Sequence, residues 1–220
     1  MGFLVSPGVD VNEIDLTNVI PAVSTSIGGI VGHFKWGPVE ELVSVGSETE
    51  LVANYGKPDS NNFGQWLQAA AFLQYGSALN VYRYNSTSLN NSSSGGGTYL
   101  IKNKDNYESQ TLGNSPIDYF VARYPGALGN SLQVCVITNQ NYANNAETVA
   151  TGAVTRAPTA DSPLDNIHIV IIDEDGDITG TANTVLEVYE DLSTTGDKFD
   201  DGTSSYYIDV LENSSAYVWP

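Results

Sequence analysis

Two histidines and one cysteine are the side chains of this sequence best suited to acid–base or nucleophilic chemistry. His33 stands in GIVGHFKW, His168 in NIHIVII and Cys135 in SLQVCVIT. All three lie in apolar, strand-like runs, where a packed imidazole or a buried, inert thiol is more common than a catalytic group. The sequence contains no Gly-x-Ser-x-Gly elbow, no HExxH helix and no Walker loop. It therefore predicts a protein that is not an enzyme and that binds no cofactor.

An acidic cluster at residues 173–177 is the one candidate metal site. Asp173, Glu174, Asp175 and Asp177 carry oxygen ligands of the kind that Ca²⁺ prefers. The EF-hand spacing is missing, because the glycine comes too early and position 182 is alanine where a glutamate is required. The same segment contains Asp-Gly, a strong hairpin signal. We predict a structural turn with no metal, and a calcium site is the alternative.

Composition narrows the possible partners. The 220 residues suffice for one or two domains, and 41% of them are hydrophobic. Eight basic and 26 acidic residues give a formal charge of −18, which repels nucleic acid and anionic membrane surfaces. No apolar run approaches the roughly 20 residues that span a bilayer, and MGFLVSPG has no secretory signal pattern. Neither direct nucleic acid binding nor membrane insertion is expected.

Residues 21–84 are predicted to form an α/β core unit. Ser47 precedes Glu50 by three residues, which is a capping box, and Gly56 with Pro58 ends the helix expected over 48–55. A second helix is predicted from apolar residues at spacings of three and four, followed by Gly76: Phe63, Trp66, Leu67, Ala70, Ala71 and Leu73. ALNVYRY then returns as a strand beside residues 26–34, where Gly28 and Gly32 indicate close packing or a bend.

The remainder predicts an α+β fold with an inserted module. Residues 85–97, NSTSLNNSSSGGG, are expected to be a flexible linker. Residues 98–203 are expected to be a mainly β insertion, a sandwich or meander, with 98–109 as a short strand and turn and 139–163 as a long loop. Residues 204–220, together with sequence beyond the chain end, are expected to complete the 21–84 unit.

An extended N-terminal arm, residues 1–20, precedes the core unit. Its apolar residues alternate like those of a strand, but no neighbouring segment can pair with it. It is either a frayed terminus or an arm that adds a strand to the sheet of another subunit.

Several phrases, in their order along the chain, resemble the tail sheath proteins of contractile-tailed bacteriophages. They are SPGVDVNEID, STSIGGIVGHFKWGPVEELVSVGSETELVANYGKP, FLQYGSALNVYRY, ARYPGALGNSLQVCVI, IVIIDEDGDITGTANTVLEVYEDLS and YYIDVLENSSAYVWP. The resemblance covers the N-terminal portion of that family, whose members are longer, and excludes the linker and the 139–163 loop.

The resemblance implies a structural virion protein. Sheath subunits form stacked hexameric rings around a tail tube and contract to drive the tube through the host envelope for genome ejection. The implied partners are other copies of the chain in the helical sheath, the tail tube protein, and baseplate and tail terminator proteins. The implied location is the virion, with assembly in the host cytoplasm. The implied inter-subunit arm is Ser6, Pro7, Gly8, Val9, Val11, Ile14 and Leu16.

Two other function classes remain open from the residues alone. An acidic cell-surface or adhesin-like β-domain protein would share the Ser, Thr and Asn richness, and a secreted polysaccharide-binding module would use the 13 tyrosines. The missing signal pattern disfavours the first class, and the scattered positions of the tyrosines disfavour the second.

Overall fold

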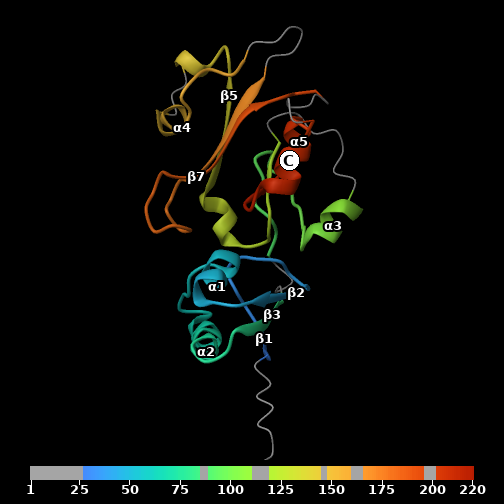
Figure 1. The fold of residues 1–220 in the computed structure, drawn as a ribbon, viewed down its shortest axis with the longest axis vertical. Helices are drawn as coiled ribbons and strands as arrows, with labels where there is room; N and C mark the ends of the chain where they lie inside the picture. The colour runs from blue at the N-terminus through green and yellow to red at the C-terminus, as the bar shows by residue number, and fades with distance from the viewer. Residues whose placement is uncertain (1–26, 85–88, 111–118, 145–147, 160–165, 196–201) are drawn as a thin grey trace, which may run out of the picture.

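The structure, a computed structural model, describes residues 27–84, 89–110, 119–144, 148–159, 166–195 and 202–220. These residues form helices and strands in three separate sheets, which confirms the predicted α+β class. Two units follow one another along the long axis of the molecule (Figure 1).

The first unit is a three-stranded sheet with two helices. Its elements are β1 (Ile27–Gly32), β2 (Leu42–Val45), α1 (Glu48–Tyr55), α2 (Phe63–Leu73) and β3 (Ala78–Arg83). The strand order is β1-β3-β2, with β1 parallel and β2 antiparallel to the central β3. Both helices pack against one face of the sheet, around a core of Phe34, Val45, Leu51, Tyr55, Trp66, Ala69, Ala70, Leu79 and Val81. The predicted pairing of ALNVYRY with the first strand is confirmed.

Local signals fix α1 at its predicted bounds. The Ser47 hydroxyl accepts a hydrogen bond from the Glu50 N–H at 3.2 Å, and the Glu50 carboxylate accepts one from the Gly46 N–H at 2.8 Å. Gly56 ends the helix at φ 78°, a conformation that glycine adopts at little cost. The predicted helix over 48–55 is confirmed.

Two glycines bring α2 close to β1. A Cβ atom at Gly28 would lie 2.6 Å from the Phe72 ring, and one at Gly32 would lie 2.7 Å from Oε1 of Gln65. A larger residue at Gly28 would meet the Phe72 ring, and one at Gly32 would meet the end of the Gln65 side chain. Of the two predicted alternatives, close packing or a bend, the structure shows close packing of this strand.

The second unit is built around an antiparallel meander. Its elements are α3 (Lys104–Ser109), β4 (Val121–Ala122), η1 (Ala127–Ser131), β5 (Leu132–Thr138), η2 (Tyr142–Asn144), α4 (Thr148–Ala153), β6 (Ile167–Asp173), β7 (Thr184–Leu192), α5 (Tyr207–Ser214) and β8 (Val218–Trp219). The strand order is β5-β6-β7, and every residue of β6 is buried. Helix α4 covers one face of this sheet and α5 the other. The meander alternative and the hairpin around Asp175-Gly176 are confirmed.

Two segments before β4 differ from prediction. Residues 98–109 contain the helix α3, because the Asn103 side chain accepts from the Asn106 N–H at 2.9 Å and starts a turn where a strand was expected. Within the predicted linker, the described residues 89–97 are held in place, since the Asn91 amide donates to the carbonyls of Ile101 and Ala122. The flexible-linker prediction is wrong for that part; residues 85–88 lie outside the description.

The last stretch also lies elsewhere than predicted. Residues 204–220 were expected to complete the first unit, yet α5 packs on the β5-β6-β7 sheet and β8 pairs with β4. Trp219 is fully buried against Ile101 and Val121, so its apolar surface is used within the second unit. The predicted 139–163 loop contains two short helices, η2 and α4, in its described part.

Candidate assembly surface

The predicted arm residues, Ser6, Pro7, Gly8, Val9, Val11, Ile14 and Leu16, lie outside the described residues. The first described residue, Ile27, begins β1. The surface around β1 is therefore the described surface nearest in sequence to the predicted arm. That surface has two apolar parts, on opposite sides of the first unit.

The first part is the open face of the β1-β3-β2 sheet, formed by the residues that alternate away from α1 and α2. Val31, Tyr82 and Leu42 lie side by side across the three strands. The side chains of Val31 and Leu42 are 65% and 64% exposed, and Ile27, farther along β1, is 64% exposed. No described residue covers these side chains, which form an apolar row across the three strands.

This exposure is unusual for the strand type involved. Strand β1, IGGIVG, is apolar on both faces and runs parallel to β3. Parallel strands with that composition are normally covered on both sides. Strands β1 and β2 are also the edges of the sheet within the described residues, and edge strands leave backbone groups available for pairing. The face and its edges together form a surface suited to another polypeptide.

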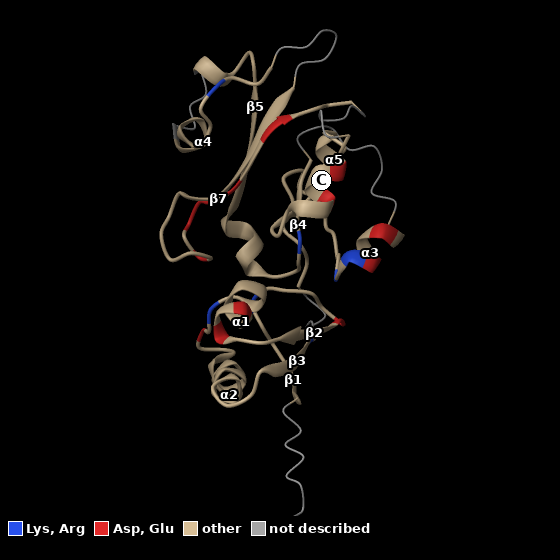
Figure 2. Cartoon of the chain, in the orientation of Figure 1, with Lys and Arg blue, Asp and Glu red and all other residues tan. Residues whose placement is uncertain are grey.

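The second part is the outer stripe of α2 and the turn after it. Phe63, Leu67, Ala71 and Tyr75 recur at intervals of four, and Phe63, Leu67 and Tyr75 are 55%, 49% and 94% exposed. Residues 60–82 contain no charged side chain, and α2 carries no red or blue in Figure 2. The apolar residues that predicted this helix therefore lie on two sides of it, one packed in the core and one exposed among the described residues.

A buried arginine joins the two units. Arg83, at the end of β3, is 1% exposed and donates to the carbonyls of Phe34 at 2.8 Å, Gly37 at 2.7 Å and Pro125 at 2.6 Å. Burial lowers the pKa of its guanidinium to about 10, which leaves it charged near neutral pH. Sequence reasoning did not single out Arg83, because its acceptors are more than forty residues away.

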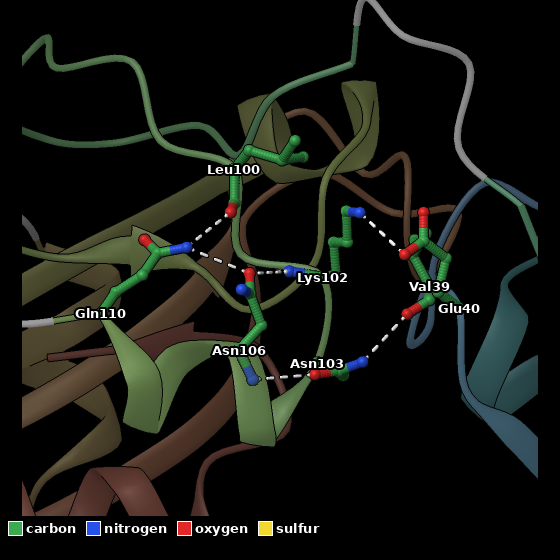
Figure 3. A network of polar contacts seen from close by, with 7 residues as sticks. All are labelled: Val39, Glu40, Leu100, Lys102, Asn103, Asn106 and Gln110. Atoms are coloured by element: carbon green, nitrogen blue, oxygen red, sulfur yellow. Dashed lines mark hydrogen bonds and ion pairs between the residues drawn. The ribbon is translucent and has the colours of Figure 1, made fainter.

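A second set of polar contacts lies beside this junction (Figure 3). Lys102 Nζ is 2.7 Å from a carboxylate oxygen of Glu40, the Asn103 amide donates to the carbonyl of Val39 at 3.1 Å, and the Val39 N–H donates to the carbonyl of Lys102 at 2.8 Å. The Asn106 side chain accepts from the Lys102 N–H and thereby orders the turn that begins α3. These contacts connect the segment after β1 to the start of the second unit.

An open cavity of about 440 Å³ lies between the units and is lined by both polar and apolar residues. His33 stands at its edge, with its ring centroid 4.1 Å from that of Tyr84 and its backbone N–H donating to Gln65. Lys35 and Asp59, also in the lining, are 3.6 Å apart. This lining has no nucleophile held by a base, and the arrangement is that of a junction between packed units.

The other two reactive side chains have structural positions. His168 is fully buried; its Nδ1 accepts from the Asp191 N–H at 2.9 Å, so its Nε2 donates to the carbonyl of Arg156 at 3.1 Å. Cys135 is 7% exposed and packs between β6 and α4. Both agree with the prediction of packed residues in strands.

The acidic turn is organised by one carboxylate. Asp173 is fully buried and accepts from the Ser131 hydroxyl at 2.5 Å, the Thr179 N–H at 2.7 Å and the Ile178 N–H at 3.2 Å. Burial by itself raises the pKa of Asp173, but the hydrogen bonds from Ser131, Thr179 and Ile178 outweigh it and the net shift is downward. Glu174, Asp175 and Asp177 point to solvent around the turn.

The described residues contain no group of three or more His, Cys, Asp or Glu side chains placed to hold a metal ion. None of their helices is long and apolar enough to cross a membrane.

Comparison with known proteins gives one consistent result. The tail sheath protein of Salmonella phage ViI is 34% identical over 211 residues, which cover 92% of this chain and 31% of that protein. The tail sheath protein of Vibrio phage KVP40 is 36% identical over 80 residues, or 36% of this chain and 12% of that protein. The match to the solved structure of a sheath tail protein from Listeria innocua covers 81% of this chain and 28% of that protein's chain, with a TM-score of 0.42 and 14% sequence identity. No family model matches the sequence. The chain spans about a third of the length of the first relative.

Proposed function

The chain is homologous to phage tail sheath proteins, and on that premise we propose that it is a structural subunit of a contractile tail sheath. The observation that carries this proposal is the similarity to one sheath protein over 92% of the chain, in a single order. Two features of the described residues support the proposal. They include exposed apolar faces and open strand edges, and the reactive side chains His168 and Cys135 are buried in the core. The protein acts through assembly and catalyses no reaction.

In the proposed assembly, subunits form stacked hexameric rings around a tail tube. They contract to drive the tube through the host envelope for genome ejection. The partners are other copies of the chain, the tail tube protein, and the baseplate and tail terminator proteins at the two ends. The subunits assemble in the host cytoplasm and reside in the virion.

The arm, Ser6–Leu16, is proposed to link neighbouring subunits as an added strand. A row of backbone hydrogen bonds is hard to break all at once, so subunits joined in this way stay linked while their bodies move. The charge of −18 makes contacts between the bodies sensitive to salt and able to exchange during contraction. Better burial between the bodies then supplies the energy, and no nucleotide is consumed.

We retain the proposed division of the chain, amended at its end. Residues 1–20 form the arm, 21–84 the α/β unit, 85–97 the connection and 98–203 the inserted module. Within the described residues the β1 and β2 edges of the α/β unit are open, whereas residues 204–220 join the inserted module.

Removal of the arm tests this function. Deletion of residues 1–16 from the full-length protein should leave a folded monomer that no longer polymerises, as seen by negative-stain microscopy and sedimentation. In a finer version, Val9→Asp with Val11→Asp should abolish the tubes, whereas Asp10→Asn with Asn12→Asp, on the alternate face, should not. Tubes that form without residues 1–16 would refute the role of the arm, and discrete particles from the intact protein would refute the sheath function.

A further inference from the structure

A β-bulge in the second unit places the side chain of His168 against a backbone N–H. The register of β6 and β7 shifts between Ile167 and Ile169, so that Glu190 and Asp191 lie opposite the single residue His168. Asp191 has φ 53°, a left-handed conformation that is uncommon outside glycine. The Asp191 N–H donates to Nδ1 of His168 at 2.9 Å, so the imidazole takes the place of a strand partner.

The same imidazole holds the segment that follows α4. Its Nε2 lies 3.1 Å from the carbonyl oxygen of Arg156, and the Arg156 guanidinium pairs with the Asp191 carboxylate. The Thr159 N–H donates to that carboxylate at 2.8 Å. These four residues form a closed network, here called the His168 network, which attaches residues 154–159 to β6 and β7.

The network requires a neutral imidazole. Nδ1 must be unprotonated because it faces an N–H, and Nε2 must carry the hydrogen because it faces a carbonyl. A second proton would set an N–H of His168 against the N–H of Asp191. It would also place a charge on a side chain that is fully buried. Protonation and the closed network therefore exclude one another.

Among the described residues, few ionisable groups surround this imidazole. The elements packed around it carry Arg156, Asp191, Cys135 and Tyr142, with Glu190 exposed beside Asp191. Burial by itself raises the pKa of Asp191, but the Thr159 N–H and the Arg156 guanidinium outweigh it and the net shift is downward. The Asp191 carboxylate thus keeps its charge in mild acid. An imidazole is the group of this set that ordinarily binds a proton between pH 7.5 and pH 5.

We propose that His168 is a pH-sensitive switch that controls the attachment of α4 and residues 154–159 to the β5-β6-β7 sheet. With a neutral imidazole the network is closed and α4 covers one face of the sheet. When the network opens, the imidazole reaches water and binds a proton. Opening therefore becomes more favourable as the pH falls below about 6.5, the ordinary pKa of an imidazole. The switch belongs to the second unit and does not depend on the proposed sheath role.

Labelling of the Cys135 thiol measures the opening, because that thiol is 7% exposed and lies beneath α4. A pyridyl disulfide reagent reacts with thiols in mild acid, and mass spectrometry of the full-length protein locates the label. The labelling rate of the parent, divided by that of His168→Asn, should rise at least about tenfold from pH 7.5 to pH 5. The asparagine retains an acceptor for the Asp191 N–H and does not titrate. His168→Gln, which retains a donor for the Arg156 carbonyl, gives a second comparison.

The matched control is His33→Asn, which removes the other histidine of the chain, at the edge of the cavity between the units. Its labelling rate should follow that of the parent at every pH. A pH response that persists in both His168 variants, or that disappears in His33→Asn, would overturn the proposal.

Hydrogen exchange on the unaltered protein tests the switch without a substitution. Relative to their intrinsic rates, the amides of residues 154–159 should exchange faster at pH 5 than at pH 7.5, while those of β1 and β3 should not. Equal acceleration throughout the chain would mean that acid unfolds the whole protein, and unchanged exchange at residues 154–159 would mean that the network stays closed. Either result contradicts a switch at His168.

Discussion

At the residue scale, the sequence did not show that two charged groups, Arg83 and Asp173, are buried with partners far along the chain. Arg83 reaches carbonyls 49, 46 and 42 residues away, and Asp173 takes a donor from Ser131, 42 residues before it. Nothing near either residue in the sequence marks these partners. Cys135 and His168 were easier to interpret, because an apolar strand pattern on both sides already indicates packing. His33 differs from them, since it follows the end of β1 and lies at the edge of the open cavity.

Asp173→Asn should destabilise the second unit by about 1–3 kcal/mol. The amide keeps one acceptor oxygen but turns an N–H₂ group toward the N–H donors of Ile178 and Thr179, which then lack an acceptor. Urea denaturation measures the change. Asp175→Asn, an exposed substitution that removes the same charge from the same turn, should stay within about 0.5 kcal/mol.

The same substitution should alter the response to acid. Because the pKa of Asp173 is lowered by folding, its contribution to stability is complete above the ordinary carboxyl pKa of about 3.9. It is lost as the pH falls through the lower, folded value. The stability of Asp173→Asn should therefore fall less steeply than that of the parent below about pH 4, and parallel curves would contradict the assigned role of this carboxylate.

At the element scale, a helix was predictable from the sequence when the residues that begin and end it lie within or next to the helix itself. The helix over 48–55 was located to the residue, since a capping box and a terminal glycine lie within its own sequence. The stripe of α2 was found, but its division into buried and exposed halves was not, because exposure depends on partners. Helix α3 was missed because its start depends on the Asn103 cap within an otherwise polar run.

Ser47→Ala measures the value of the local signal at α1. Loss of the hydroxyl leaves the Glu50 N–H without its acceptor, which should lower the free energy of unfolding by about 1 kcal/mol. Thermal and urea unfolding would report it. Ser60→Ala, at an exposed position just before α2, should change stability by no more than about 0.5 kcal/mol; equal losses would mean that the cap is not what holds α1.

At the scale of the whole molecule, two separately built cores are held together by a small set of polar contacts and by an apolar cluster of Trp36, Ala122 and Leu128. The α+β class and the meander were predictable from alternation and turn signals. The assignment of residues 204–220 was not, because the buried site of Trp219 is created by segments around residues 101 and 121.

Arg83→Met should weaken this junction. The methionine fills part of the space but leaves the carbonyls of Phe34, Gly37 and Pro125 without their donor, at a cost of about 3 kcal/mol or more. Hydrogen exchange should accelerate around residues 34–37 and 125–127. The control, Arg156→Met, removes a more exposed arginine paired with Asp191 and should cost about 1 kcal/mol or less. Equal effects of the two variants would contradict the central role of Arg83.

The pairing of β4 with β8 also sets an order of events on the ribosome. The first unit closes its sheet within residues 27–83, whereas the Trp219 indole reaches the Arg123 carbonyl across 96 residues. Local contacts form before distant ones, and chains emerge from the N-terminal side. During translation the first unit can thus fold before β8 has been synthesised. Until then the nascent chain carries a folded first unit and a second unit whose β4 has no partner strand.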